Sequence, residues 1–214
     1  MVRVGLKYAF LFFVLCVIFL FFGFKVNAAF YVLSAVFFLL FVFCFYFFRD
    51  PVRNIGKDEN IILSPADGTV FEISETDEPH FIKTRAKIVK IFLSVFNVHL
   101  QRAPIAGEIK FIKIQDGLVL KANHPDASEK NKQNLVGIRG KIPVLVKQIA
   151  GIIAQRCDLW VKMDQKIGQG DKIGVIHFGS QVDIYMPLDT EIKVKNGDKV
   201  AGGLTVIGSV KNCP

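Results

Sequence analysis

Two long apolar runs near the N-terminus constrain this chain more than any other feature. Residues 8–24 form an apolar run of 17 residues and residues 28–48 a run of 21, with a three-residue break between them. As α-helices they would be roughly 26 and 31 Å long, which matches the ~30 Å hydrocarbon core of a bilayer. Apolar side chains occupy every face of both helices, as contact with lipid requires. We therefore predict a transmembrane helical hairpin that makes residues 1–48 a membrane anchor.

The cations around these runs predict the orientation of the hairpin. Positive charge favours the cytoplasmic side of a membrane, and only Lys25 lies between the two runs. The other cations precede the first run or follow the second: Arg3, Lys7, Arg49 and Arg53. Both ends, and the domain that follows, are therefore expected on the cytoplasmic side of the inner membrane. The alternative is a signal peptide cleaved near residues 26–28, which would leave the second run unexplained.

The remainder of the chain has the composition of a folded, mildly basic domain. Residues 49–214 carry 24 Lys and Arg against 19 Asp and Glu, within a chain of 214 residues and net charge +8. Their apolar content excludes disorder, and a domain of this length buries its own core without disulfides. The small charge excess argues against nucleic-acid binding. The cysteines have no metal-site spacing, so we expect no bound metal: Cys16, Cys44, Cys157 and Cys213.

Short β-like runs separated by turn residues predict a β-rich domain over 61–214, after a charged linker over 49–60. Residues 122–134 are polar and indicate a surface loop. Residues 144–157 fit either a helix or a strand, and we favour a strand. The other runs that we assign to strands are 61–63, 69–73, 86–94, 107–114 paired with 118–120, 173–178 and 182–186.

Two Gly-Asp pairs indicate a weak internal repeat. Residues 170–174 and 197–202 resemble each other, and each segment lies between β-like runs. Glycine takes positive φ and aspartate bonds its own backbone, so each pair predicts a tight turn. Compact β modules of the barrel-sandwich type use such turns, although unrelated hairpins would explain the pairs equally well.

Three residues have the chemistry of a nucleophile, a base and an orienting acid. Ser180 lies between two apolar runs, His99 ends an apolar strand, and Asp67 lies in a Pro-Ala-Asp-Gly turn. A serine hydroxyl needs a base to become a nucleophile, and a catalytic histidine needs a partner that fixes its tautomer. Each residue also has an ordinary structural explanation, and any chain of this length contains a serine, a histidine and an aspartate.

The sequences around these residues are more specific. They are Ser64-Pro-Ala-Asp-Gly68, Phe96-Asn-Val-His-Leu-Gln-Arg-Ala-Pro104, Gln148-Ile-Ala-Gly151 and His177-Phe-Gly-Ser-Gln-Val-Asp183. In this order and spacing, over roughly residues 50–210, they resemble the short bacterial and archaeal type of phosphatidylserine decarboxylase proenzyme. The segment Phe-Gly-Ser-x-Val-Asp is the most specific part of the resemblance. Departures from the family pattern stand at Asn97, Arg102, His177 and Gln181.

The resemblance implies a self-processing enzyme that makes its own cofactor. The chain would be cut between Gly179 and Ser180, and Ser180 would become a covalent pyruvoyl group, a bound form of pyruvate. Ser180 Oγ would attack the Gly179 carbonyl, with His99 as the base and Asp67 as the group that orients it. The large and small chains would stay together as a heterodimer, and higher oligomers are compatible with the pattern.

The implied reaction is the decarboxylation of phosphatidylserine, a phospholipid held in the membrane, to phosphatidylethanolamine. The pyruvoyl group would accept the electrons left when CO₂ departs, as a pyridoxal ring does in other enzymes. The lipid phosphate calls for cationic donors, for which Arg102 and Arg156 are candidates, with His177 beside the site. The implied fold is α+β and β-rich, with two packed sheets of the barrel-sandwich kind following the transmembrane helical hairpin.

Two other interpretations stay open. The same chemistry could act on another serine-headed lipid, such as archaetidylserine, and the lipid pocket rather than the catalytic residues would then differ. A non-enzymatic, membrane-tethered β module would instead predict an uncut chain.

Overall fold

The computed structural model describes residues 2–118, 120, 127–151, 156–177 and 180–210. The chain divides into two units, Met1–Pro51 and Val52–Pro214. The first unit is helical and the second is β-rich, so the change of structure follows the change of composition in the sequence.

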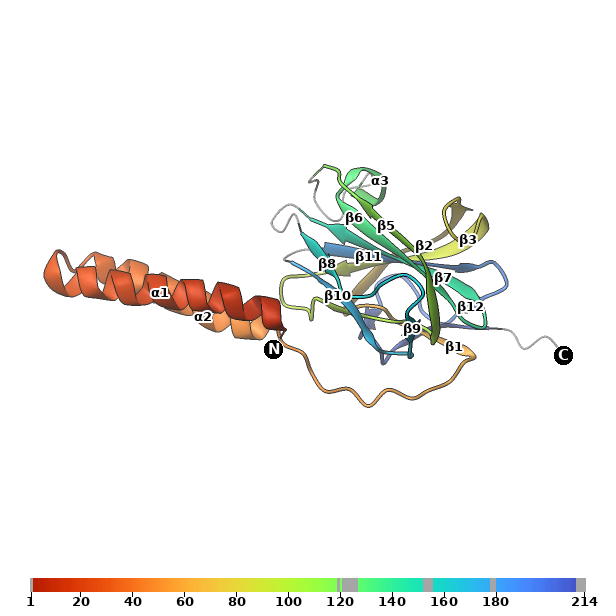
Figure 1. The fold of residues 1–214 in the computed structure, drawn as a ribbon, viewed down its shortest axis with the longest axis horizontal. Coiled ribbons are helices and arrows are strands. Elements are labelled where there is room, and N and C mark those ends of the chain that lie inside the picture. Colours follow the sequence, from red (N-terminus) through yellow and green to blue (C-terminus); the bar gives the residue numbers. More distant parts are fainter. Residues whose placement is uncertain (1, 119, 121–126, 152–155, 178–179, 211–214) are drawn as a thin grey trace. The chain divides into compact units, whose positions relative to one another are not determined.

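The N-terminal unit is a helical hairpin made of α1 (Arg3–Lys25) and α2 (Phe30–Phe47) (Figure 1). The most apolar window of each helix has a mean hydropathy of 2.5, and only 11% and 17% of these windows are buried. Helices this long, apolar and exposed are suited to the interior of a bilayer. The two predicted helices are confirmed, although α1 begins earlier than the apolar run.

Aromatic stacking and one polar contact join the two helices. Phe19 stacks on Phe37 with the ring centroids 5.3 Å apart. Ser34 Oγ donates a hydrogen bond of 2.9 Å to the carbonyl of Cys16. Because hydrocarbon offers no hydrogen-bond partner, a hydroxyl that donates to a neighbouring carbonyl avoids a large penalty. The hairpin therefore satisfies its internal polar group while it presents apolar side chains outward.

The described residues of the second unit form three antiparallel sheets, one of which is large and curled (Figure 1). The 8-stranded sheet has the order β13-β2-β3-β11-β7-β6-β5-β9, and the 3-stranded sheets have the orders β4-β10-β8 and β1-β14-β12. The strands are β1 (Ile61–Leu63), β2 (Gly68–Glu78), β3 (Thr84–Leu93), β4 (Leu100–Arg102), β5 (Gly107–Gln115), β6 (Gln133–Arg139), β7 (Pro143–Ala150), β8 (Cys157–Leu159), β9 (Lys166–Ile167), β10 (Lys172–Ile176), β11 (Ser180–Pro187), β12 (Glu191–Ile192), β13 (Lys199–Val200) and β14 (Val206–Ser209).

Strand β11 occupies the middle of the 8-stranded sheet and pairs with β3 on one side and β7 on the other. Alternate side chains of a strand point to opposite faces. Val182, Ile184 and Met186 join the main hydrophobic core, whereas Tyr185 joins a second apolar cluster on the opposite face. The strand is therefore buried on both faces, and its first residue, Ser180, is buried as well.

Most predicted strands are confirmed, and the β-rich α+β fold with them. Residues 144–150 lie in β7, so a strand is correct for this part of the ambiguous segment. The predicted pairing of 107–114 with 118–120 is wrong, because β5 pairs with β6 and β9. Of the surface loop predicted over 122–134, residues 122–126 lie outside the described residues, and the prediction is wrong at its end, where α3 (Ala127–Lys130) precedes β6. Gln133 and Asn134 are polar, but both are buried, and hydropathy alone misplaces them.

The two Gly-Asp pairs form equivalent turns. Gly170 has φ +83° and Gly197 has φ +92°, the region that favours glycine. In each turn the aspartate accepts a hydrogen bond from the backbone N–H three residues earlier, Gly168 to Asp171 at 2.7 Å and Lys195 to Asp198 at 2.9 Å. The sequence repeat therefore corresponds to a repeated local structure.

Candidate active site

Ser180 is the first residue of β11, directly opposite Leu93 of β3 and Ala150 of β7. It is fully buried, and its Oγ has no hydrogen-bond partner among the residues that the structure describes. Ser180 lies two residues before Val182 in the strand, so its side chain points to the same face and therefore toward the main core. Gly179 lies outside the described residues, so only the Ser180 side of the predicted cleavage point is seen.

His99 lies immediately before β4, and the neighbouring strand brings His177 to the same end of the small sheet. Strands β4 and β10 are antiparallel with Leu100 opposite Val175, and the N–H of Ile176 donates to the His99 carbonyl at 3.2 Å. Both histidines are almost completely buried. From this end of β10 the chain continues directly to Ser180. The fold therefore brings both histidines to the end of the small sheet that leads into the predicted nucleophile.

The tautomer of His99 is set by a backbone carbonyl. Its Nδ1 lies 3.0 Å from the carbonyl oxygen of Asn97. Since a carbonyl oxygen only accepts hydrogen bonds, Nδ1 carries the proton and Nε2 is the basic nitrogen of the neutral ring. This is the orienting function that the sequence analysis gave to Asp67.

Asp67 makes other contacts in this structure. Its carboxylate accepts two hydrogen bonds from the Arg53 guanidinium, at 2.7 and 2.8 Å, and one from the N–H of Gly202 at 2.8 Å. The pair is largely buried, with side-chain exposures of 7% for Arg53 and 14% for Asp67. Asp67 therefore fastens the segment before β1 to the domain, and its role toward His99 stays a prediction.

A chain of buried amides connects the large sheet to His99. Asn134 donates to Gln148 at 3.1 Å, Gln148 donates to Gln101 at 2.9 Å, and Gln101 donates to the His99 carbonyl at 2.7 Å. All are at most 2% exposed. Buried amides are tolerated only when they are paired, so the chain fixes the distance between the two sheets. The sequence motifs do not reveal this chain of amides, although Gln148, which interrupts an apolar run, is a signal for it.

His177 forms a second polar group with Asp158 of β8 and with Arg156, which directly precedes that strand. Its Nε2 lies 3.2 Å from Asp158 Oδ2, and Arg156 Nε donates to Asp158 Oδ1 at 2.6 Å. Burial lowers the pKa of His177 below its ordinary value, although the neighbouring Asp158 opposes this shift. His177 is therefore favoured in its neutral form.

The opposite face of β11 carries its own buried polar group. Gln181 Nε2 donates to Asp183 Oδ1 at 2.6 Å and to Ser128 Oγ at 2.7 Å. Asp183 lies opposite Lys90 on β3 and Lys147 on β7. Burial raises the pKa of Asp183 above its ordinary value, although the Gln181 hydrogen bond and Lys147 oppose this shift. Gln181, a departure from the family pattern, thus ties the start of β11 to α3.

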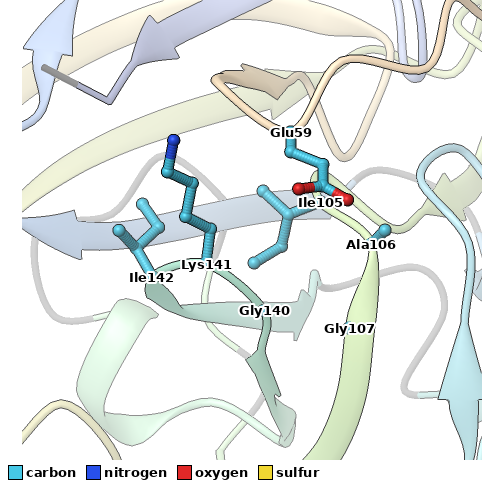
Figure 2. Close-up of a pocket in the computed structure, with 7 residues that line it drawn as sticks. All are labelled: Glu59, Ile105, Ala106, Gly107, Gly140, Lys141 and Ile142. Atoms are coloured by element: carbon cyan, nitrogen blue, oxygen red, sulfur yellow. The ribbon is translucent and has the colours of Figure 1, made fainter. Parts of the chain in front are cut away.

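The pocket in Figure 2 lies away from these groups. Its cavity of about 500 Å³ is lined by the start of β5 and the turn between β6 and β7, with Glu59 and Lys141 as its charged side chains. Lys141 Nζ donates to Asn60 at 2.6 Å. The turn is at the opposite end of β7 from Ala150 and therefore roughly 20 Å from Ser180. This pocket is not part of the candidate site.

Comparison with known proteins assigns this arrangement to a family. A family model described as phosphatidylserine decarboxylase matches residues 40–208. This chain belongs to the phosphatidylserine decarboxylase family. The phosphatidylserine decarboxylase proenzyme of Carboxydothermus hydrogenoformans is 43% identical over 181 residues, which are 84% of this chain and 85% of that protein. The proenzyme of Symbiobacterium thermophilum is 40% identical over 178 residues, covering 82% and 83% of the two chains.

Membership in the phosphatidylserine decarboxylase family confirms the resemblance drawn from the four sequence segments. The matched region contains Asp67, His99 and Ser180. The phosphatidylserine decarboxylase proenzyme of Ehrlichia chaffeensis aligns over 195 residues, 90% of this chain, at 37% identity. These relatives are named as proenzymes, that is, as precursors that are processed.

Proposed function

We propose that this protein decarboxylates phosphatidylserine to phosphatidylethanolamine, using a pyruvoyl group formed when the chain cuts itself between Gly179 and Ser180. The observation that carries the proposal is the state of Ser180. It is fully buried at the start of a central strand, and its Oγ has no hydrogen-bond partner within the described part of the chain. A buried hydroxyl without a partner is costly, and such costs are typical of reactive positions.

The self-cleavage step assigns roles to two residues. Ser180 Oγ attacks the carbonyl carbon of Gly179 and His99 Nε2 takes the hydroxyl proton, so that an ester replaces the peptide bond and the amine of residue 180 is freed. Elimination of the residue 179 carboxylate then leaves a dehydroalanine, which water converts to the pyruvoyl group and ammonia. The Asn97 carbonyl supports this assignment, because it holds the proton on Nδ1 and leaves Nε2 basic.

The residues around Ser180 fit a pyruvoyl group. The group is no larger than the serine from which it forms, and the unpartnered Oγ position requires no other hydrogen bond to break. Once formed, the group supplies an electron sink for the electrons left by CO₂. In the decarboxylation step His99 would return a proton to the product.

The fold also supports a stable pair of chains after cleavage. The small chain would begin with β11, which is hydrogen-bonded along its length to β3 and along most of it to β7. Its later strand β14 pairs with β1 of the large chain. Cutting the chain before β11 therefore leaves the core contacts of the small chain in place. The hairpin of α1 and α2 would anchor this heterodimer to the membrane, and the flanking cations favour the cytoplasmic side.

Ser180→Ala tests this proposal most simply. The purified wild-type protein should run as two chains on a denaturing gel and should release CO₂ from phosphatidylserine in detergent micelles. Ser180→Ala should give one full-length chain with no activity, because it lacks the attacking oxygen. His99→Ala should slow cleavage by at least about 100-fold. Cleavage of the Ser180→Ala chain at the same peptide bond would exclude Ser180 as the nucleophile.

A further inference from the structure

The structure has a solvent-connected cavity of about 590 Å³ beside the end of β8, near the candidate active site. Two cationic residues line it, Lys132 and Arg156, together with the Asn134 amide and the carboxylate of Asp158, which pairs with Arg156. Apolar walls are provided by Ile114, which is 65% exposed, and Trp160, which is 38% exposed. A cavity that combines two cations with exposed apolar side chains matches a ligand that is an anion at one end and apolar at the other.

The sheet register places Lys132 close to Ser180. Ala150 lies directly opposite Ser180, and the N–H of Ala150 donates to the Lys132 carbonyl at 3.0 Å. The three residues therefore form one row across neighbouring strands and share one face of the sheet. Two strand spacings separate the ends of the row, about 10 Å. Ser180 and the alanine between them are both buried, so a ligand would approach this row from the cavity that Lys132 lines.

Arg156 approaches the same place from the small sheet. The N–H of His177 donates to the Arg156 carbonyl at 3.1 Å, which fixes Arg156 beside the end of β10. The Asp158 carboxylate bridges the Arg156 side chain and His177. One wall of the cavity is therefore hydrogen-bonded to a histidine that lies three residues before Ser180.

The two cations differ in how firmly they are held. Lys132 pairs with Asp116, whose side chain is 88% exposed, and an exposed ion pair contributes little to stability, so turning Lys132 toward a ligand costs little. The Arg156 side chain is 63% exposed, but its partner Asp158 is only 16% exposed, so Arg156 offers its positive charge from a fixed place. A phosphodiester accepts charge-assisted hydrogen bonds from both residue types.

We propose that Lys132 and Arg156 bind the phosphate of the phospholipid headgroup in this cavity. This proposal rests on the proposed decarboxylation, because that reaction defines the distance between the phosphate and the carbon that must react at Ser180. In a phosphoserine headgroup one CH₂ and one oxygen separate the phosphorus from the carbon that bears the amine and carboxylate. A phosphate held in the cavity therefore keeps the reacting carbon near Ser180.

Another cationic cavity among the described residues is less suitable for this role. It measures about 640 Å³ and is lined by Arg53, Arg102 and Lys172 among others. Arg102 lies opposite Lys172 at the end of the β4–β10 pair that is farther from His99, and it donates to the Gly170 carbonyl at 3.0 Å. Of the two arginines that the sequence suggested for headgroup binding, the placement favours Arg156.

Kinetics of the processed full-length enzyme test the proposal. In micelles that contain phosphatidylserine, Lys132→Gln and Arg156→Gln should each raise KM about tenfold, the loss expected for one charge-assisted hydrogen bond. Lys132→Arg should restore most of the affinity. The control is Lys193→Gln, which removes a lysine of similar exposure that pairs with Glu191 beside the β1-β14-β12 sheet, and it should leave KM unchanged.

Soluble inhibitors separate the headgroup from free phosphate. Glycerophosphoserine should inhibit the wild type competitively, and its inhibition constant should rise about tenfold in Lys132→Gln. If inorganic phosphate inhibits the wild type as strongly, and its inhibition constant also rises about tenfold in Lys132→Gln, the cavity is a general anion site and the headgroup assignment is contradicted. If the wild type decarboxylates phosphatidylserine normally and Lys132→Gln has an unchanged KM, this inference is overturned and the proposed function is not. A wild type without decarboxylase activity would overturn the proposed function.

Discussion

Ser180 and Asp183 belong to the same strand but face opposite sides of it, and both are fully buried. On one side the serine hydroxyl has no hydrogen-bond partner within the described residues. On the other side Gln181 holds the Asp183 carboxyl and the Ser128 hydroxyl. Polar contacts on one face of β11 therefore hold the strand in place, while on the other face the oxygen that we propose as the nucleophile has no hydrogen-bond partner within the described residues.

Asp67 has two possible roles, orienting His99 as the mechanism predicts and holding Arg53 as the structure shows, and a pair of variants distinguishes them. We expect Asp67→Asn to slow self-cleavage by about 100-fold or more, because an orienting carboxylate stabilises the protonated histidine. Arg53→Gln breaks the same ion pair but leaves the carboxylate in place. It should slow cleavage much less, and the time course of the two product bands measures both rates. Equal rates for the two variants would mean that Asp67 acts only by holding Arg53.

The buried carboxyl of Asp183 should make the free energy of unfolding depend on pH. Burial raises its pKa, so the folded state binds the proton more tightly than the unfolded state does. The free energy of unfolding contributed by this group therefore falls as pH rises from the ordinary carboxyl pKa through the folded value. Asp183→Asn does not titrate, so its Tm relative to the parent should become more favourable over that rise in pH. Thermal melts of the uncut Ser180→Ala chain, with and without Asp183→Asn, measure this, and an advantage that shrinks with pH would contradict it.

At the scale of the elements, the amide chain joins two sheets that share no strand. Gln148 belongs to the 8-stranded sheet and Gln101 to β4 of the 3-stranded sheet. Backbone hydrogen bonds cannot span two packed sheets, so buried side-chain amides determine how they sit against each other. The position of His99 relative to β11 depends on this contact, because Gln101 also holds the His99 carbonyl.

Gln148→Leu should therefore affect both stability and processing. It leaves the Gln101 acceptor unpaired and removes one of two hydrogen bonds of the Asn134 amide, which keeps its bond to the Cys157 carbonyl, at a cost of about 2 kcal/mol in the free energy of unfolding. Self-cleavage should slow as well, because His99 loses a support. The matched control is Gln165→Leu, which removes an exposed glutamine that accepts from the N–H of Lys162, and it should change neither property. Denaturant unfolding and the cleavage time course measure the two effects, and a normal cleavage rate in Gln148→Leu would contradict the support role.

Different elements were predictable from sequence to different degrees. The hairpin helices and strands such as β3 and β11 follow from long apolar runs bounded by turn residues. Strand β6 was missed because it begins with Gln133 and Asn134, whose burial depends on partners in other strands. The candidate residues Ser180 and His99 came from local motifs. Lys132 and Asp158 could not be found this way, since only the tertiary structure brings them toward those residues. The Asn97 carbonyl lies two residues before His99, but the motif alone does not show that it contacts Nδ1.

At the scale of the whole molecule, the apolar segment suited to a membrane and the candidate active site belong to different units. One unit is an apolar hairpin whose composition suits a bilayer, and the other is a β-rich body whose central strand begins at Ser180. A phospholipid substrate explains why one chain carries both units. In this account the covalent break falls just before the central strand, where the surrounding sheet holds both products together.

The mass of the small chain is the most direct test of the central claim, because that chain would carry the new chemical group. Under denaturing conditions the account predicts a fragment covering residues 180–214. Its N-terminus should lack the serine amine, resist N-terminal sequencing and react with a hydrazine reagent as a ketone does. An uncut chain of 214 residues, or a small chain that begins with an ordinary serine, would contradict the account.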